Sequence, residues 1–282
     1  MLNLTRACLG VTFALSTAFA LESSSFQRTL TVNGAVELDV TTGAGHIRVT
    51  PGNASTVEVR GTVKLSNDWT GSHEKELAAV LANPPIEQTG NTIRLVPLKD
   101  EELRRHVQIS YDIVTPAATR LKAKSGAGAV SADGLQGPVD VSTGAGAVTM
   151  SHIEGDVALS TGAGAVEIDS VKGQVTARTG AGAIHGKAIA GAVKANTGSG
   201  SVQLEQTAAG PVQAHTGSGS VAVRLPQQAA FSLAAHSGWG KVTVDHPLDT
   251  QPAKDSRDVK GNVRGGGPLV DLSTGVGSVR VQ

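Results

Sequence analysis

A six-residue stretch, Thr143-Gly144-Ala145-Gly146-Ala147-Val148, recurs along the chain and constrains the fold more than any other feature of the sequence. Copies that keep both glycines open at Thr42, Ser125, Thr143, Thr161, Thr179, Thr197, Thr216, Ser237 and Thr274. From Ser125 to Thr197 the step is 18 residues each time, and it then lengthens to 19 and 21. A fixed period of this length indicates one short structural unit stacked on itself.

The residues on both sides of the motif alternate between apolar and polar. Apolar residues stand four and two places before the opening Thr or Ser and five and usually seven places after it, as in Val139, Val141, Val148 and Met150. This is the period of a β-strand, and many of these residues are β-branched, as strands prefer. Stacked coils place equivalent positions of the repeat about 4.8 Å apart, so that similar side chains stack on one another. We therefore predict an all-β parallel β-helix, or β-solenoid, with coils of about 18 residues.

The two glycines of each copy are expected to form a tight corner between two strands. A Cβ atom there would oppose the backbone conformation of the corner and crowd the neighbouring coil. The opening Thr or Ser continues the inward phase of the preceding strand, so we expect its hydroxyl to bond to backbone groups of the corner.

The first half of the mature chain reads as a β-rich N-terminal cap with one short helix. Strands are expected at 28–32, 35–40, 46–49, 56–65, 92–95 and 106–114, a helix at 72–81 with Ser72 as N-cap, and a charged loop at 100–105. Residues 21–120 would form this cap and the first coils, and residues 121–282 the solenoid repeats. A polar loop is expected at 246–261, within an insertion near 246–264, and the coil at 269–281 would close the stack with little cap.

Residues 1–20 have the features of a signal peptide. Arg6 supplies a positive charge, an apolar run follows, and Ala18-Phe19-Ala20 is a small-x-small cleavage site. The single cysteine, Cys8, lies within this segment, so the mature protein would have no disulfide. Removing Arg6 from the 24 basic residues leaves 23 against 24 acidic ones, which argues against nucleic acid as a partner. No transmembrane segment is expected in the mature chain, which would be periplasmic or extracellular.

Two further stretches resemble a known family. The first, before the regular Thr-Gly-x-Gly-x-Val repeats, is the expected strand sequence Gln108-Ile109-Ser110-Tyr111-Asp112-Ile113-Val114-Thr115-Pro116. The second, near the end of the chain, is the stretch from Gly265 to Gly277. Together, over roughly residues 28–282, these features resemble the bacterial putative-adhesin family, a domain of unknown function with β-strand repeats. The resemblance implies a parallel β-solenoid in the cell envelope. Family repeats commonly place Asp after the second glycine, whereas Ala or Ser usually stands there in this chain.

No set of residues in the repeat frame forms a recognisable catalytic, cofactor or metal site. The Gly-Ala-Gly corners lead into strands, whereas a phosphate-binding loop leads into a helix. Among the acidic residues Asp140, Asp156, Glu167, Asp169 and Glu205, only Asp169 and Glu205 share a position in the frame, two coils apart. They are therefore not expected to build a calcium site.

Three residues remain as candidates for surface chemistry. His215 and His236 stand just before the opening residue of neighbouring copies, so stacked coils would bring them within about 5 Å. Two imidazoles fall short of a metal site, and the same column elsewhere is simply polar. Trp239 is the one aromatic residue in a corner. It is either an exposed contact residue or a cap packed under the 246–261 loop.

These observations favour a non-catalytic, cofactor-free protein that binds a protein or glycan surface of the envelope, or acts as a scaffold there. Two alternatives stay open. One is an enzyme acting on polysaccharide, a lyase or glycosidase, which would need paired carboxylates, or a base with a cation, converging in one groove. The other is a homo-oligomer assembled end to end through uncapped coil ends.

Overall fold

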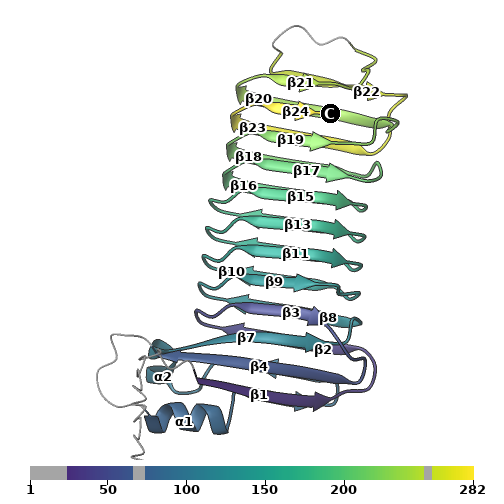
Figure 1. Cartoon of the computed structure of the whole chain (residues 1–282). Coiled ribbons are helices and arrows are strands. Elements are labelled where there is room, and N and C mark those ends of the chain that lie inside the picture. Colours follow the sequence, from purple (N-terminus) through teal and green to yellow (C-terminus); the bar gives the residue numbers. More distant parts are fainter. Residues whose placement is uncertain (1–23, 66–73, 251–255) are drawn as a thin grey trace, which may run out of the picture.

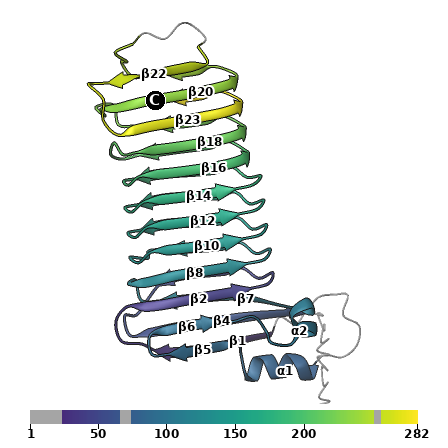
Figure 2. The same cartoon turned by 180° about the vertical axis from the view of Figure 1, so that it is seen from behind.

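The computed structural model describes residues 24–65, 74–250 and 256–282, which form one flattened solenoid of two facing sheets (Figure 1, Figure 2). In spatial order, sheet A contains β1 (Ser24–Thr31), β4 (Thr56–Leu65), β7 (Val107–Thr115), β3 (Ile47–Pro51), β9 (Val130–Asp133), β11 (Val148–Ile153), β13 (Val166–Val171), β15 (Ile184–Ile189), β17 (Val202–Gln206), β19 (Val221–Arg224), β24 (Val279–Val281) and β21 (Val242–Val244). Sheet B contains β22 (Asp258–Val263), β20 (Phe231–Trp239), β23 (Leu269–Val276), β18 (Val212–Ser218), β16 (Val193–Ser199), β14 (Val175–Thr179), β12 (Val157–Thr161), β10 (Val139–Thr143), β8 (Thr119–Ser125), β2 (Val36–Thr42), β6 (Thr92–Leu95) and β5 (Ile86–Thr89). The helices are α1 (Glu74–Ala82) and α2 (Glu101–His106).

Each regular coil runs along a sheet B strand, turns at the Gly-x-Gly corner, and returns along a sheet A strand. Neighbouring strands are parallel and in register, so Val139 pairs with Val157, and Val157 pairs with Val175. On sheet A, Val148 pairs with Val166 in the same way. The predicted parallel β-solenoid with like residues stacked on like is therefore confirmed.

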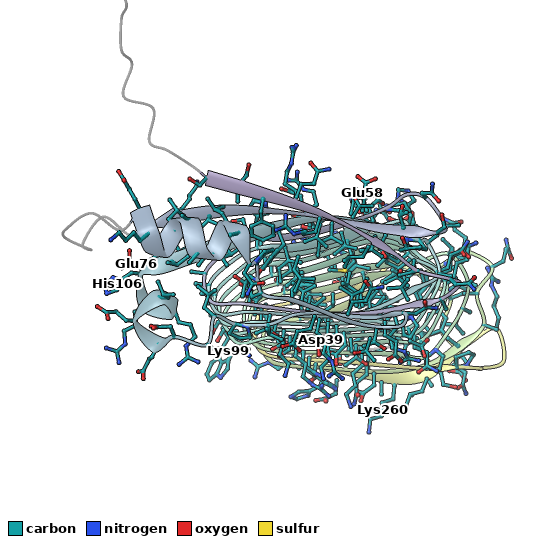
Figure 3. The ribbon with its side chains drawn as sticks, turned by 90° about the horizontal axis from the view of Figure 1, so that it is seen from below. Asp39, Glu58, Glu76, Lys99, His106 and Lys260 are labelled. Atoms are coloured by element: carbon teal, nitrogen blue, oxygen red, sulfur yellow. The ribbon has the colours of Figure 1, made fainter. Side chains whose placement is uncertain are left out.

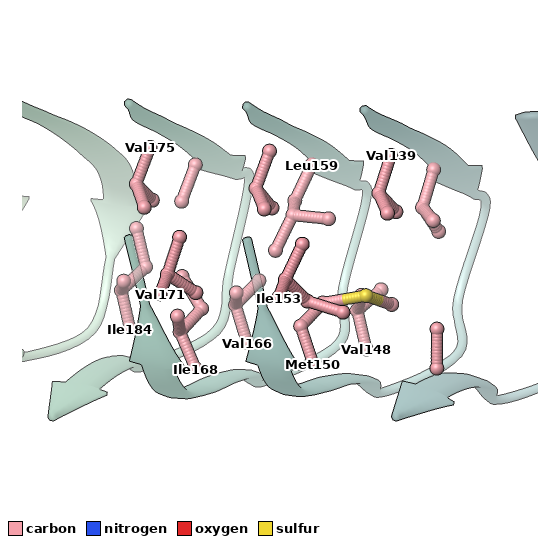
Figure 4. Packing of buried hydrophobic residues seen from close by; sticks show 14 of the residues in the cluster. Val139, Val148, Met150, Ile153, Leu159, Val166, Ile168, Val171, Val175 and Ile184 are labelled. Atoms are coloured by element: carbon pink, nitrogen blue, oxygen red, sulfur yellow. The ribbon is translucent and has the colours of Figure 1, made fainter. Parts of the chain in front are cut away.

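The solenoid interior is filled by the apolar residues of the repeat. Val139, Leu159 and Val175 on sheet B face Met150 and the neighbouring aliphatic side chains of sheet A across a narrow core (Figure 4). These side chains are at most 3% exposed. Because full burial of such a side chain contributes about 1.5–3 kcal/mol, the aliphatic columns are the main source of stability of this thin fold.

The corner glycines are explained by contact between coils. A Cβ atom built on Gly162 would lie 2.3 Å from the carbonyl oxygen of Gly144, and one on Gly164 would lie 1.8 Å from that of Gly146. Most of these glycines keep a negative φ. The requirement for glycine is therefore set mainly by the close approach of the preceding coil rather than by backbone conformation.

A ladder of buried hydroxyl groups follows the corner along the solenoid. The Thr161 hydroxyl donates to the Gly146 carbonyl of the preceding coil at 3.0 Å, and it accepts the Gly164 N–H at 3.1 Å. This confirms the predicted hydrogen bonds to corner backbone groups, which satisfy polar groups at the edge of an apolar core. The hydroxyl-to-carbonyl bonds recur at Thr42, Ser125, Thr143, Thr179, Thr197, Thr216, Ser237 and Thr274.

The N-terminal end is covered by strands that leave the repeat pattern. On sheet A, β7 is parallel to β3, and β4 and β1 then add antiparallel. On sheet B, β6 pairs with β2, and β5 adds antiparallel. The helix α1 lies beside β1 at this end (Figure 1), and the Arg28 guanidinium donates to the Ala82 carbonyl at 3.0 Å. A β-rich cap with a helix was predicted here, although Ser72 lies outside the described residues.

The prediction of a charged loop at 100–105 is wrong, because most of these residues form the helix α2. The Asp100 side chain caps it by accepting the N–H groups of Glu102 and Leu103. Acidic residues occupy the first turn and basic residues the last, which suits the helix dipole. Leu103 packs against the core and fixes the helix to the cap.

The order of coils at the other end differs from the order of the chain. The final strand pair, β23 and β24, lies between the coil of β18 and β19 and the coil of β20 and β21. The expectation that this coil closes the stack is therefore wrong. The outermost strand of sheet B is β22, antiparallel to β20, so the stretch predicted as a polar loop at 246–261 is partly strand.

The predicted signal peptide, including Cys8 and the Ala18-Phe19-Ala20 site, lies outside the described residues. Among the residues that are described, no helix has the length and apolar character needed to cross a membrane.

Candidate functional site

The outward faces of both sheets are flat and polar, because every second residue of each strand points to solvent. Seen along the solenoid from its N-terminal end, Asp39 and Lys260 project from sheet B and Glu58 from sheet A (Figure 3). Asp169 of β13 pairs with Lys187 of β15, which separates it from Glu205 of β17. The side chain of Lys187 thus lies between the two carboxylates that occupy the same position of the repeat.

Three histidines of the repeats, His152, His215 and His236, lie close to carboxylates of neighbouring strands. His152 Nδ1 lies 2.8 Å from Asp133 Oδ1, and this hydrogen bond raises the pKa of the exposed His152 above its ordinary value, with a smaller contribution from Asp169. Within the described ranges, no three His, Cys, Asp or Glu side chains come together in a group that could hold a metal ion.

The prediction that His215 and His236 lie within about 5 Å of each other is wrong, because the final coil lies between them. Ser273 of β23 pairs with His215 on one side and with His236 on the other. The two histidines are thus two strand spacings apart, about 9–10 Å, which is too far for a shared metal ion. Each instead has its own partners: His215 Nδ1 lies 2.5 Å from Ser273 Oγ, and His236 Nδ1 lies 2.6 Å from Asp258 Oδ1.

The group of Ser273, His215 and Asp271 contains the residue types of a hydrolase triad. His215 Nε2 lies 3.8 Å from Asp271 Oδ2, on the side of the ring away from the serine. However, Ser273 lies in the middle of β23, which is paired on both sides, so its surrounding N–H groups belong to the sheet ladder. A hydrolase needs free N–H groups to stabilise the oxyanion, and this flat face is not built to supply them.

Trp239 is the most exposed large apolar side chain of the described residues, at 73%. It ends β20 at the corner edge and pairs in register with Val276 of β23, which is 55% exposed. The Arg257 guanidinium lies over the Trp239 ring, 5.6 Å from its centroid. Trp239 is therefore exposed and not packed under a cap, because Arg257 contacts the ring without burying it. Its role as a contact residue stays a prediction.

We call this surface the distal patch and define it as Trp239, Val276, Arg257, His236 and Asp258. It lies at the end of the solenoid opposite α1 (Figure 1). On the same sheet, nearer the start of the strands, a shallow groove of about 400 Å³ crosses the outward face, and its lining residue Asp271 stands five residues before Val276. The groove is lined by amide, hydroxyl, charged and apolar side chains that include Gln174, Thr176, Lys194, Gln213, Leu269 and Asp271.

Comparison with known proteins places this solenoid in a family. Residues 16–282 match the family described as Toastrack DUF4097. The chain belongs to the Toastrack DUF4097 family. The resemblance to the putative-adhesin family, a domain of unknown function, is thereby confirmed.

Two solved structures are similar to this chain at low sequence identity. A crystal structure of a putative adhesin from Bacteroides fragilis has a TM-score of 0.50 and 15% identity, covering 93% of this chain and 99% of that one. A putative cell adhesion protein from Clostridium sporogenes has a TM-score of 0.26 and 13% identity, covering 92% and 99%. The first of these likenesses supports the fold alone. Comparison with curated proteins gives no significant match.

Several residues of this Toastrack surface were not found from the sequence. The sequence indicated Trp239, His215 and His236, and the structure places Trp239 and His236 together on β20. It did not indicate Val276, Arg257 or the groove, because these depend on the coil order. The one available signal was the Pro-containing stretch before Leu269, which is long enough to carry the last coil back into the stack.

Proposed function

We propose that this Toastrack protein is an exported, non-catalytic, adhesin-like protein of the cell envelope that binds a glycan through the distal patch, with the groove on the same sheet as a second contact for an extended chain. The observation that carries the proposal is the exposure of Trp239. A large aromatic ring left in water at one end of a rigid scaffold is typical of a contact surface. The C–H face of a sugar ring packs on such an aromatic ring, and the neighbouring amide and carboxylate groups suit sugar hydroxyls.

The alternatives receive less support from the geometry. Paired carboxylates, as most glycosidases use, are not found in the groove on sheet B, which has Asp271 as its one carboxylate among the described lining residues. A base with a cation would have to be Asp271 with Lys194 of the same groove, and Asp271 already lies 3.8 Å from the imidazole of His215. End-to-end assembly was considered because the last coil was expected to be open. The distal sheet B edge is instead covered by β22, which lies antiparallel to β20. An antiparallel strand interrupts the parallel stack that a second molecule would have to continue.

The test is binding to an array of bacterial envelope polysaccharides and host-type oligosaccharides, with the Trp239→Ala variant compared with the parent. We expect at least one glycan to bind, and its affinity to fall by about tenfold or more in Trp239→Ala, as for other central aromatic contacts. Arg280→Ala is the control, because Arg280 is exposed on β24 of the neighbouring coil, on the opposite sheet from Trp239. Equal binding by Trp239→Ala and the parent would contradict the proposal, as would release of new reducing ends from a bound polysaccharide.

A further inference from the structure

The N-terminal cap contains a pocket of about 270 Å³ that no part of the proposed function uses. Its lining residues come from the end of β2, the segment after β6, α2 and β7. These elements lie at the opposite end of the solenoid from β20 and β22, which carry the distal patch (Figure 1). The wall of the pocket is mainly apolar and includes Val96, Leu98, Val107 and Ile109. A small, mostly apolar pocket with a few polar groups is the usual form of a small-ligand site.

Two polar side chains of this wall have no partner among the described residues. The side chain of Arg104 in α2 has no hydrogen bond or ion pair there, whereas that of the next residue, Arg105, pairs with Glu101 at 2.6 Å. Tyr111 of β7 is 1% exposed, and its hydroxyl also has no partner in the described part of the chain. The Tyr111 hydroxyl faces the pocket and is not fully buried, so water reaches it, and a bound acceptor would replace this water.

The chemistry of these groups restricts the ligand. The guanidinium of Arg104 is always a cationic donor. Burial raises the pKa of Tyr111 far above its ordinary value, so the hydroxyl keeps its proton and remains a donor. The Thr42 hydroxyl, also in the wall, already donates to the Ile109 carbonyl at 2.7 Å. The polar end of the ligand is therefore an anionic acceptor, and the rest of it is apolar.

We infer that this pocket binds a small aliphatic carboxylate. Arg104 at the exposed side of the pocket holds the carboxylate, Tyr111 supplies a second hydrogen bond, and the aliphatic chain packs against Val96, Leu98 and Val107. The planar fork of the guanidinium matches both carboxylate and phosphate groups, and the carboxylate is the smaller of the two, which suits a pocket of about 270 Å³. The volume of the pocket lies near the lower limit for ligand sites, which favours a short chain.

The experiment is calorimetric titration of the protein from residue 21 onward with sodium hexanoate, octanoate and decanoate. We expect saturable one-to-one binding of at least one of them, weakened about tenfold by Arg104→Gln because a charge-assisted hydrogen bond is lost. Tyr111→Phe, which keeps the ring and removes the hydroxyl, should weaken binding severalfold. The neutral alcohol of the same chain length should bind more weakly than the carboxylate.

Arg105→Gln is the matched control, because it removes the same charge from the same helix outside the pocket. Its affinity for the carboxylate should equal that of the parent protein. Absence of saturable binding for all three carboxylates would overturn the inference. Equal losses in Arg104→Gln and Arg105→Gln would also overturn it, since the attraction would then be a general effect of surface charge. Neither result depends on whether the distal patch binds a glycan.

Discussion

Gly162→Val is expected to lower the free energy of unfolding by at least about 4 kcal/mol, or to prevent folding. The added Cβ would lie 2.3 Å from the Gly144 carbonyl oxygen, and this oxygen belongs to the backbone of the preceding coil. Strand pairs hold both coils in register on either side of the corner, so neither can move away without breaking hydrogen bonds. Urea denaturation followed by circular dichroism measures the loss.

Gly43 provides the matched control for this prediction, because it occupies the same corner position in the first coil. A Cβ on Gly43 meets no atom within 4 Å. We therefore expect Gly43→Ala to change stability by less than about 1 kcal/mol, while Gly162→Ala is strongly destabilising. Ser160→Ala, on the exposed face of β12, should also have little effect. If Gly43→Ala were as harmful as Gly162→Ala, contact with the neighbouring coil would not be the reason for the glycine.

Removing residues 267–282 is expected to disrupt two coils that precede this segment in the sequence. The segment buries Val270, Leu272, Val279 and Val281, each at most 1% exposed, and each contributes about 1.5–3 kcal/mol. It is also the partner that joins β18 to β20 and β19 to β21. The truncated protein should therefore lose amide hydrogen-exchange protection throughout 212–244. Its unpaired strand edges on β18 to β21 should also make it prone to aggregation.

The control for the truncation is Leu269→Ser, which changes an exposed side chain of the same segment and should leave the melting temperature nearly unchanged. A solenoid stacked in chain order would respond differently to the truncation, because only its last coil would be lost. Undiminished protection of β18 and β19 in the truncated protein would therefore contradict the observed coil order.

The 18-residue period was enough to predict the sheets, the corners and the hydroxyl ladder. Each of these depends on a residue and its equivalents one coil away, as with Thr161 and Gly146. The position of the last coil depends instead on which strands β23 and β24 pair with. Thr274-Gly275-Val276-Gly277 is compatible with any neighbour in the stack, because all copies present the same corner. Only the connecting segments decide, and their lengths allow more than one route.

The helix α2 and the pocket beside it were not predicted from the sequence, for a different reason. Six residues are too few for a helical period to appear, and the charges of Glu101 to Arg105 are equally typical of a solvated loop. Asp100 was the available signal, since an Asp before acidic residues is a common N-cap. Trp239 was identified because it interrupts a column of small residues, but Arg257 was not, because its position depends on β22.

The most direct test of the account is the pairing of introduced cysteines, because the distal patch exists only if the final coil lies between its neighbours. The one native cysteine, Cys8, is absent from protein that begins at Leu21. Adjacent parallel strands are about 4.8 Å apart, a separation that a disulfide can span, whereas two spacings cannot be bridged. Mild oxidation and mass spectrometry of the monomer would be applied to two double variants.

The account predicts a disulfide in His215→Cys/Ser273→Cys, whose positions pair in register, and none in His215→Cys/His236→Cys. A disulfide between positions 215 and 236, with none between 215 and 273, would show that the coils stack in chain order and would contradict both the fold of the distal end and the site built on it.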